Sequence, residues 1–403
     1  MKEIELKARN GKPRLRGLTE EDMASKLDEL ALSPSVTPDT RSSKEKNTDV
    51  IIGEGRDLRF PLLLSYPLFV DTNQFGMVNK SVRIALAYGA SIAKTPINLC
   101  EGILPEEKRM AKKVKGDFIL QWSPFRIGIG IKTLAKGKGI VIDLGGTQHP
   151  NTVLLNELLD RMQGKGGLVG GEALGPRRHL DISSSKDIKK HVELLREATG
   201  YNVPIMVKIP PWEVYENTKS ALEAEADAVI IDTSADPFST PASINRTFTW
   251  PLIGPIPPAM KAFKAANARK KGIKLLVSGG FRNGADIVKV LALGADAVGI
   301  VESASIAIGC DLCGKCYKGE CKKGIATRNP QLKSNFDWKI AGKRLANYIK
   351  ATKKEIELLL EFIGVDGVQD LSSRHVMALT YDAAAITGIK LVGYDRELPM
   401  WFH

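Results

Sequence analysis

Short apolar runs that alternate with amphipathic stretches are the feature that most limits the fold of this 403-residue chain. Nearly continuous apolar runs indicate strands covered on both faces, and their alternation with helical patterns indicates parallel β/α units. Eight runs have the length of a strand: 67–70, 91–94, 118–121, 140–144, 205–209, 228–232, 275–278 and 297–301. Eight units are the number that closes an α/β fold into a (β/α)8 TIM barrel, whose active site lies at the carboxyl ends of the strands. We therefore predict this barrel, with functional residues directly after the runs.

Four cysteines follow the last run within twelve residues: Cys310, Cys313, Cys316 and Cys321. Two-residue gaps let a chain curl around one centre, so the thiolates are expected to share a metal or an iron–sulfur cluster. Disulfides are disfavoured, because a chain of this size builds its core without them and Cys100 is the only other cysteine. Zinc remains an alternative, but zinc ribbons usually divide their ligands into two separated pairs. We predict an iron–sulfur cluster.

A glycine turn after the seventh run indicates a phosphate site. Glycines at the end of a strand let backbone amides approach an anion, and the helix expected from about residue 285 would present its N-terminus there. In barrels of this kind the loops after the seventh and eighth strands often bind phosphate, although glycines after a strand are usually only turns. The residues predicted to line the site are Ser278, Gly279, Gly280, Gly299, Glu302 and Ser303.

This region resembles the FMN-binding synthase domain of glutamate synthase, through the runs GGFRNGADIVKVLALGADAVGI, ASIAIGC and KKGIATRNPQL. The family's cluster ligands have the spacing C-x5-C-x4-C, which falls here on Cys310, Cys316 and Cys321 and implies a 3Fe-4S cluster. Cys313 is additional and would convert the cluster to 4Fe-4S. The resemblance covers residues 60–390 and implies FMN, an iron–sulfur cluster and oxidoreductase activity in glutamate biosynthesis. Electrons would pass through the cluster to FMN and on to an imine formed from 2-oxoglutarate and ammonia.

The resemblance also implies contacts to the flavin at the strand ends. Asp71, Thr72 and Asn73 stand where the family has small residues that border the flavin, with an ordinary turn as the alternative. Gln121 matches a family glutamine and is expected at the pyrimidine edge of the flavin. Arg126 is a candidate for binding an anionic group.

Two residues are candidates for catalysis by the same resemblance. Lys208 matches the lysine of a family V-K-L motif, and a buried ammonium is costly unless it meets a negative group. The flavin N1/O2 edge, which becomes negative on reduction, is one such group, and a carboxylate such as Asp232 is the alternative. Glu172 matches a family glutamate only across an inserted helix. A family lysine is absent from the same loop, so the substrate pocket is expected to differ.

We divide the chain into a polar N-terminal extension (1–60), the FMN-binding barrel (61–309), the cysteine loop (310–330) and a C-terminal helical extension packed on the barrel (331–403). The net charge of +12 allows nucleic acid, a membrane surface or an acidic partner. No nucleic-acid-binding motif accompanies it, so a lysine-rich solvated surface is preferred. No apolar run reaches the length of a membrane span, and no targeting segment is evident. We expect a cytoplasmic protein with no nucleic-acid or membrane partner.

The motifs that do not occur bear on the expected partners. No cysteine follows Met1 and no G-x-G-x-x-G follows a strand, so the chain is expected to lack a glutaminase and a nicotinamide-binding fold. Electrons would come from ferredoxin or a reductase subunit and ammonia from solution or a separate glutaminase subunit, in an oligomer that acts on a small molecule. Three alternatives remain: an N-methylglutamate synthase-like subunit, an electron-transfer flavoprotein without its own substrate, and a zinc-bound nucleic-acid module.

Overall fold

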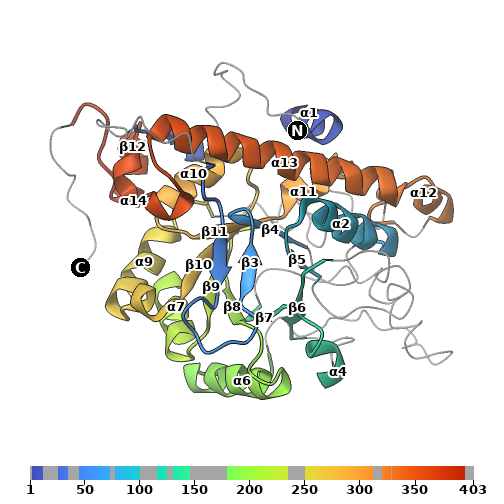
Figure 1. Cartoon of the computed structure of the whole chain (residues 1–403), viewed down its shortest axis with the longest axis horizontal. Coiled ribbons are helices and arrows are strands. Elements are labelled where there is room, and N and C mark those ends of the chain that lie inside the picture. The colour runs from blue at the N-terminus through green and yellow to red at the C-terminus, as the bar shows by residue number, and fades with distance from the viewer. Residues whose placement is uncertain are drawn as a thin grey trace.

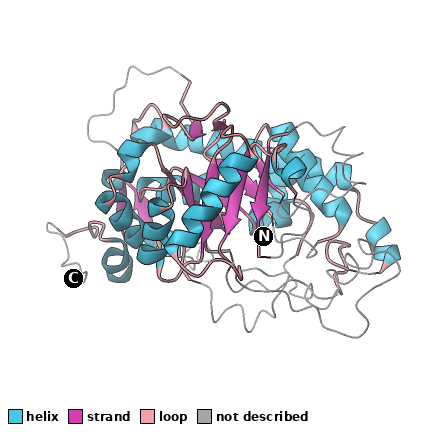
Figure 2. Cartoon of the chain, turned by 90° about the horizontal axis from the view of Figure 1, so that it is seen from below, coloured by secondary structure: helices cyan, strands magenta, loops and turns pink. Residues whose placement is uncertain are grey.

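A closed barrel of eight parallel strands is the centre of the molecule (Figures 1 and 2). The computed structural model describes residues 2–11, 26–34, 45–72, 78–99, 116–124, 130–145, 179–234, 250–311, 320–327 and 329–394. Around the barrel the strands follow the order β10-β11-β4-β5-β6-β7-β8-β9, and each pairs in parallel with its neighbours. Their bounds are β4 (Leu68–Asp71), β5 (Ile97–Asn98), β6 (Phe118–Trp122), β7 (Gly139–Asp143), β8 (Ile205–Ile209), β9 (Ala228–Asp232), β10 (Lys274–Gly279) and β11 (Ala297–Ile300). The TIM barrel predicted from the apolar runs is confirmed.

One of the eight predicted strands was wrong. Residues 91–94 complete helix α2 (Lys80–Ala93), which ends at Lys94 in the left-handed conformation. The second barrel strand is β5, only two residues long, which follows Pro96. Its brevity explains the error, because two residues carry no periodic pattern and the apolar end of a buried helix reads like a strand.

Helices cover the outside of the barrel, as Figure 2 shows. They are α2, α4 (Ile131–Leu134), α6 (Ser185–Ala198), α7 (Val214–Glu223), α9 (Ile256–Ala265) with the 3-10 turn η3 (Ala268–Lys271), α10 (Gly284–Ala292) and α11 (Glu302–Ala307). Side chains at their starts fix two of them: Ser184 accepts a hydrogen bond from the amide of Asp187, and Asn283 accepts one from the amide of Asp286. Such caps satisfy amides that have no partner within the helix.

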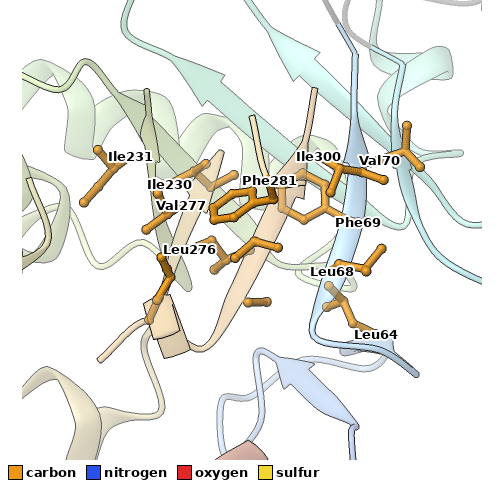
Figure 3. Close-up of a cluster of buried hydrophobic side chains, with 14 of the residues drawn as sticks. Leu64, Leu68, Phe69, Val70, Ile230, Ile231, Leu276, Val277, Phe281 and Ile300 are labelled. Carbon is orange, nitrogen blue, oxygen red and sulfur yellow. The ribbon is translucent and has the colours of Figure 1, made fainter. Parts of the chain in front are cut away.

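The apolar core is continuous through the barrel wall. Figure 3 shows side chains of β4, β9, β10 and β11 packed together with Leu64 and Phe281. Leu68, Val277 and Ile230 are fully buried there. Because successive side chains of a strand point to opposite faces, each strand contributes both to the interior and to the layer under the helices. This burial on both faces is why the strands read as unbroken apolar runs.

A small hairpin lies at the amino ends of the barrel strands. It consists of β2 (Val50–Ile52) and β3 (Leu62–Leu64), which pair antiparallel with Val50 opposite Leu64 and Ile52 opposite Leu62. The buried carboxylate of Asp227 receives the Arg56 guanidinium at 2.8 Å, the Arg196 guanidinium at 3.1 Å and the amide of Ile205 at 2.7 Å. These bonds hold the hairpin against the barrel and leave the opposite, carboxyl end for the site.

The C-terminal region is largely helical and packs on the barrel, with α13 (Trp338–Ile363) lying across it (Figure 1). Asp337 caps its start and Gly364, in the left-handed conformation, ends it. Helix α13 packs closely on α2: a Cβ added to Gly89 would lie 2.7 Å from the carbonyl oxygen of Gly342. The remaining elements are α12 (Pro330–Ser334), η5 (Val368–Asp370), η6 (Ser373–His375), α14 (Tyr381–Thr387), the 3-10 turn η2 (Lys26–Glu29), and strand β1 (Leu30–Leu32), which pairs with β12 (Val376–Ala378). No helix among the described residues is both long and apolar enough to cross a bilayer.

A buried ion pair joins the first helix to α13. Lys7, on α1 (Lys2–Asn10), is fully buried and donates to Glu355 Oε2 at 2.7 Å. The same oxygen accepts the amide of Gly284 at 2.8 Å, at the start of α10. Glu355 therefore links three helices through one carboxylate.

We predict that Lys7→Ala lowers the free energy of unfolding by about 3–5 kcal/mol, because it leaves a buried carboxylate without its counter-charge. Urea denaturation followed by circular dichroism measures the loss. The matched control is Lys354→Ala on the exposed side of α13, where the side chain is 71% exposed and pairs with Glu357 at 3.5 Å. That change should cost less than ~0.5 kcal/mol. Equal losses in the two variants would contradict the assignment of Lys7.

Candidate functional site

Seven of the eight barrel strands place a polar side chain at their carboxyl ends, and we call these residues the polar layer. Its members are Asp71, Asn98, Gln121, Asp143, Lys208, Asp232 and Ser278. Strands β4 and β8 lie on opposite sides of the barrel, yet Lys208 Nζ lies 2.6 Å from Asp71 Oδ2. A bond between opposite strands crosses the interior, so the polar layer fills the mouth of the barrel.

Asp71 is the centre of the polar layer. Its Oδ2 accepts from Lys208 Nζ at 2.6 Å and from Ser278 Oγ at 2.7 Å, and its Oδ1 accepts from Asn98 Nδ2 at 2.8 Å. The Asp71 and Lys208 side chains are 1% and 5% exposed. Charge-assisted hydrogen bonds of this kind are among the stronger ones in proteins, so the three donors fix the position of the Asp71 carboxyl group.

Gly299 makes room for this arrangement. A Cβ added to Gly299 on β11 would collide with Ser278 Oγ and lie 3.1 Å from Asp71 Cβ. Gly299 was predicted as a cofactor contact. In this structure it also leaves the space in which Ser278 and Asp71 meet. The eighth strand end must carry no side chain if Ser278 and Asp71 are to meet.

A second part of the polar layer runs from β5 to β7. Asn98 Nδ2 also donates to Gln121 Oε1 at 2.9 Å, and Gln121 Nε2 donates to Asp143 Oδ2 at 2.7 Å. Asp143 in turn accepts the amide of Gly145, and the ring of His179 lies 2.8 Å from the Asp143 carbonyl oxygen. Asn98, Asp143 and His179 are not among the residues predicted for the site. The available signal for Asp143 was a polar residue within an apolar run, whereas Asn98 ends the two-residue strand β5 and had no such signal.

Asp232 completes the polar layer beside Lys208. Its Oδ2 lies 3.9 Å from Lys208 Nζ, and its Oδ1 accepts from the hydroxyl of Ser234 at 2.6 Å. Burial raises the pKa of Asp232, because desolvation disfavours the charged carboxylate more than Lys208 favours it. Asp232, the carboxylate predicted as an alternative partner of Lys208, therefore lies farther from the ammonium than Asp71 does.

The predicted phosphate-binding turn lies next to the polar layer. Gly279 is covered by Thr233, since an added Cβ would lie 2.6 Å from Thr233 Oγ1. At Gly280 an added Cβ would lie 3.3 Å from Glu302 Oε2, so a carboxylate lies beside this turn. Ser303 is buried in the first turn of α11. The N-terminus of α10, expected to favour an anion, is already bonded to Glu355.

Thr72, which directly follows β4, makes its hydrogen bond to the backbone of the next strand. Its hydroxyl donates to the carbonyl oxygen of Asn98 at 2.5 Å, and the side chain is buried. This bond ties the ends of two neighbouring strands. Three more predicted site residues, Asn73, Arg126 and Glu172, lie outside the described residues.

Two of the four clustered cysteines are described, and both are buried. Cys310 follows α11 and is 4% exposed, and Cys321 is 1% exposed. Their loop is tied to the start of α2, because Asn79 donates from its side chain to Gly324 and from its amide to Ile325. Cys313 and Cys316 lie outside the described residues, within which no three His, Cys, Asp or Glu side chains are grouped to hold a metal ion.

Comparison with known proteins places most of the chain in one family. The family described as "Conserved region in glutamate synthase" matches residues 37–366. An archaeal-type glutamate synthase [NADPH] of Thermotoga neapolitana is 31% identical over 351 residues, which are 84% of this chain and 65% of that protein. A glutamate synthase large subunit-like protein of Rhizobium meliloti is 29% identical over 368 residues, which are 86% of this chain and 82% of that protein.

Solved structures share the fold at low identity. A mutant flavocytochrome b2 with pyruvate bound has a TM-score of 0.57 at 16% identity, covering 98% of this chain and 86% of that one. A mutant chimera of (S)-mandelate dehydrogenase also has a TM-score of 0.57, at 17% identity, covering 94% of this chain and 98% of that one. These likenesses concern the barrel architecture.

We predict that Asp232→Asn stabilises the protein more at pH 8 than at pH 5. Because the folded chain binds the Asp232 proton more tightly than the unfolded chain, the native residue costs stability as the pH rises toward its folded-state pKa. Thermal unfolding of both proteins at the two pH values measures the difference.

The matched control is Asp187→Asn in the first turn of α6. Hydrogen bonds from Ser184 and Ser183 lower the pKa of Asp187, so the stability that it contributes is complete at both pH values. Its loss in the variant should be the same at pH 5 and pH 8. A pH-independent effect of Asp232→Asn would contradict the raised pKa.

Proposed function

The chain belongs to the glutamate synthase family, and we propose that it is an oxidoreductase of the glutamate synthase type that uses FMN and an iron–sulfur cluster. The observation that carries the proposal is Lys208, whose buried ammonium lies in the polar layer at the carboxyl end of the barrel. Enzymes of this architecture have their active sites at that end. A lysine kept there despite the cost of burial favours a site that handles negative charge.

The residues at the barrel mouth fit a flavin mononucleotide. The turn at Gly279 and Gly280 has no side chains, so a ligand could approach its backbone closely. A Cβ added to Gly279 would lie only 2.6 Å from Thr233 Oγ1, so this position has no room for a side chain. Lys208 would stabilise the N1/O2 edge, and Gln121, whose amide has a second N–H and a second lone pair beyond its bonds in the polar layer, would bind the pyrimidine edge. When bound, FMN supplies the hydride chemistry, while these side chains orient it and set its charge environment.

The cysteines fit an iron–sulfur cluster. Cys310 and Cys321 are buried at the two ends of the segment that carries Cys313 and Cys316, and buried thiolates are the ligands that such clusters use. The four cysteines would hold a 4Fe-4S cluster, or three of them a 3Fe-4S cluster, which supplies one-electron transfer. We assign residues 310–330 to this loop, 61–309 to the FMN barrel, 1–60 to an N-terminal extension and 331–403 to a helical extension.

The proposed reaction makes an amino acid from a 2-oxo acid, with 2-oxoglutarate and ammonia as the first substrates to test. The family and the names of the relatives support it. The chain spans about two thirds of the Thermotoga neapolitana relative, whose name includes NADPH. We propose that electrons reach this chain from ferredoxin or a reductase subunit. The net charge of +12 would favour binding of an acidic donor. Ammonia would be free or come from a glutaminase subunit. A cytoplasmic oligomer belongs to the same proposal.

The test of the cofactor pair is anaerobic purification followed by visible and EPR spectroscopy, with assays of released flavin, iron and zinc. We expect FMN and three or four irons per chain. Cys310→Ser and Cys321→Ser should each lose iron and keep the flavin, and Cys313→Ser should change the EPR signal from that of 4Fe-4S to that of 3Fe-4S. Cys100→Ser is the matched control and should keep both cofactors. Zinc in place of iron, or no flavin, would refute the proposal.

Glu302 provides a separate test of the phosphate site, since a carboxylate beside Gly280 would repel a phosphate. We predict that Glu302→Gln binds FMN about tenfold more tightly than the native apoprotein does, the ratio produced by removing ~1.4 kcal/mol of repulsion. Quenching of flavin fluorescence measures the affinity. Riboflavin, which has no phosphate, is the control and should bind both proteins equally. An equal gain for both ligands would place the phosphate elsewhere.

A further inference from the structure

We infer that Asp71 cancels the charge of Lys208 and so lowers the reduction potential of the flavin, which matches this chain to a strongly reducing electron donor. The inference rests on the proposed function, because it concerns the flavin that the barrel would bind. It goes beyond that function in naming the residue that sets the energy of the electrons.

The geometry makes Asp71 the direct counter-ion. Its Oδ2 lies 2.6 Å from Lys208 Nζ, and Ser278 and Asn98 donate to the same carboxylate at 2.7 and 2.8 Å. The two donors hold the carboxylate in place from β10 and β5, so it does not depend on Lys208 alone for its position. With both side chains almost fully buried, solvent screens the pair weakly.

The other acidic groups near Lys208 are less effective counter-ions. Asp232 Oδ2 is 3.9 Å away, and burial raises the pKa of that carboxyl, which favours its neutral form. Asp143 is next to Lys208 in the register of β7 and β8, but the ion pairs that Lys208 makes within the described part of the chain are those to Asp71 and Asp232. Of the described carboxylates, Asp71 is therefore the one that lies closest to the ammonium.

The consequence for the flavin follows from its charge on reduction. Two electrons and one proton added to a flavin leave a negative charge at the N1/O2 edge, and a lone ammonium nearby would stabilise that charge and raise the potential. A neutral Lys208–Asp71 pair gives much less stabilisation in a buried site. The donor must then be of low potential, the class of reaction partner to which iron–sulfur proteins such as ferredoxins belong.

The experiment compares the midpoint potential of bound FMN in the holoprotein and in Asp71→Asn, by equilibrium reduction with a reference dye. Asparagine is similar in shape but carries no charge, so the potential should become more positive. Sulfite, which forms an adduct with oxidised flavin when positive charge is nearby, gives a spectroscopic readout. Its affinity should rise at least tenfold in Asp71→Asn. The matched control, Asp232→Asn, removes the more distant carboxyl and should change both quantities much less.

A double variant tests the inference without leaving an unbalanced buried charge. Lys208→Met combined with Asp71→Asn removes both charges, so the potential should stay close to the native value if the pair is neutral. With flavin bound, either of two results would overturn the inference. One is a midpoint potential well below the native value in the double variant, and the other is an unchanged potential and sulfite affinity in Asp71→Asn. Absence of flavin from the native protein would instead refute the proposed function.

Discussion

A buried ammonium at the mouth of the barrel is the constraint on which the arrangement of the site depends. An unpaired charge at Lys208 would cost several kcal/mol, and the opposite strand supplies the carboxylate that offsets it. Asp71 in turn has lone pairs to satisfy, and Asn98 and Ser278 occupy them. Gly299 is needed because any side chain there would displace Ser278. One lysine thus determines the residue type at four other strand ends.

The architecture could be predicted from the sequence because its strands are buried on both faces. Strands β8 and β9 begin and end at the predicted residues, since each is an apolar run bounded by polar or turn residues. The exception, β5, has two residues and takes its place in the barrel from pairing with β4 and β6. Such a strand is determined by tertiary hydrogen bonds, which leave no trace in local periodicity.

The site was predictable by residue but not by partner. Lys208, Asp71, Gln121 and Ser278 were each marked by their position after an apolar run, yet Lys208 and Asp71 are 137 positions apart in the chain. Only the closed order of the strands places them opposite one another. Asp232, predicted as an alternative partner of Lys208, lies on the strand next to β8, whereas the 2.6 Å bond to Asp71 crosses the barrel.

The surroundings of the glycine turn show why a phosphate there would depend on Glu302. Arg282, two residues after Gly280, is the nearest cation in the sequence, but its guanidinium pairs with Asp28 and Asp286. The start of α10 is bonded to Glu355, which also holds Lys7. Within the described residues, the turn can therefore offer its backbone amides to an anion. The start of α10 and the Arg282 guanidinium are already bonded to carboxylates. A carboxylate at this turn would therefore act on a bound phosphate without compensation from Arg282, whose charge is already paired.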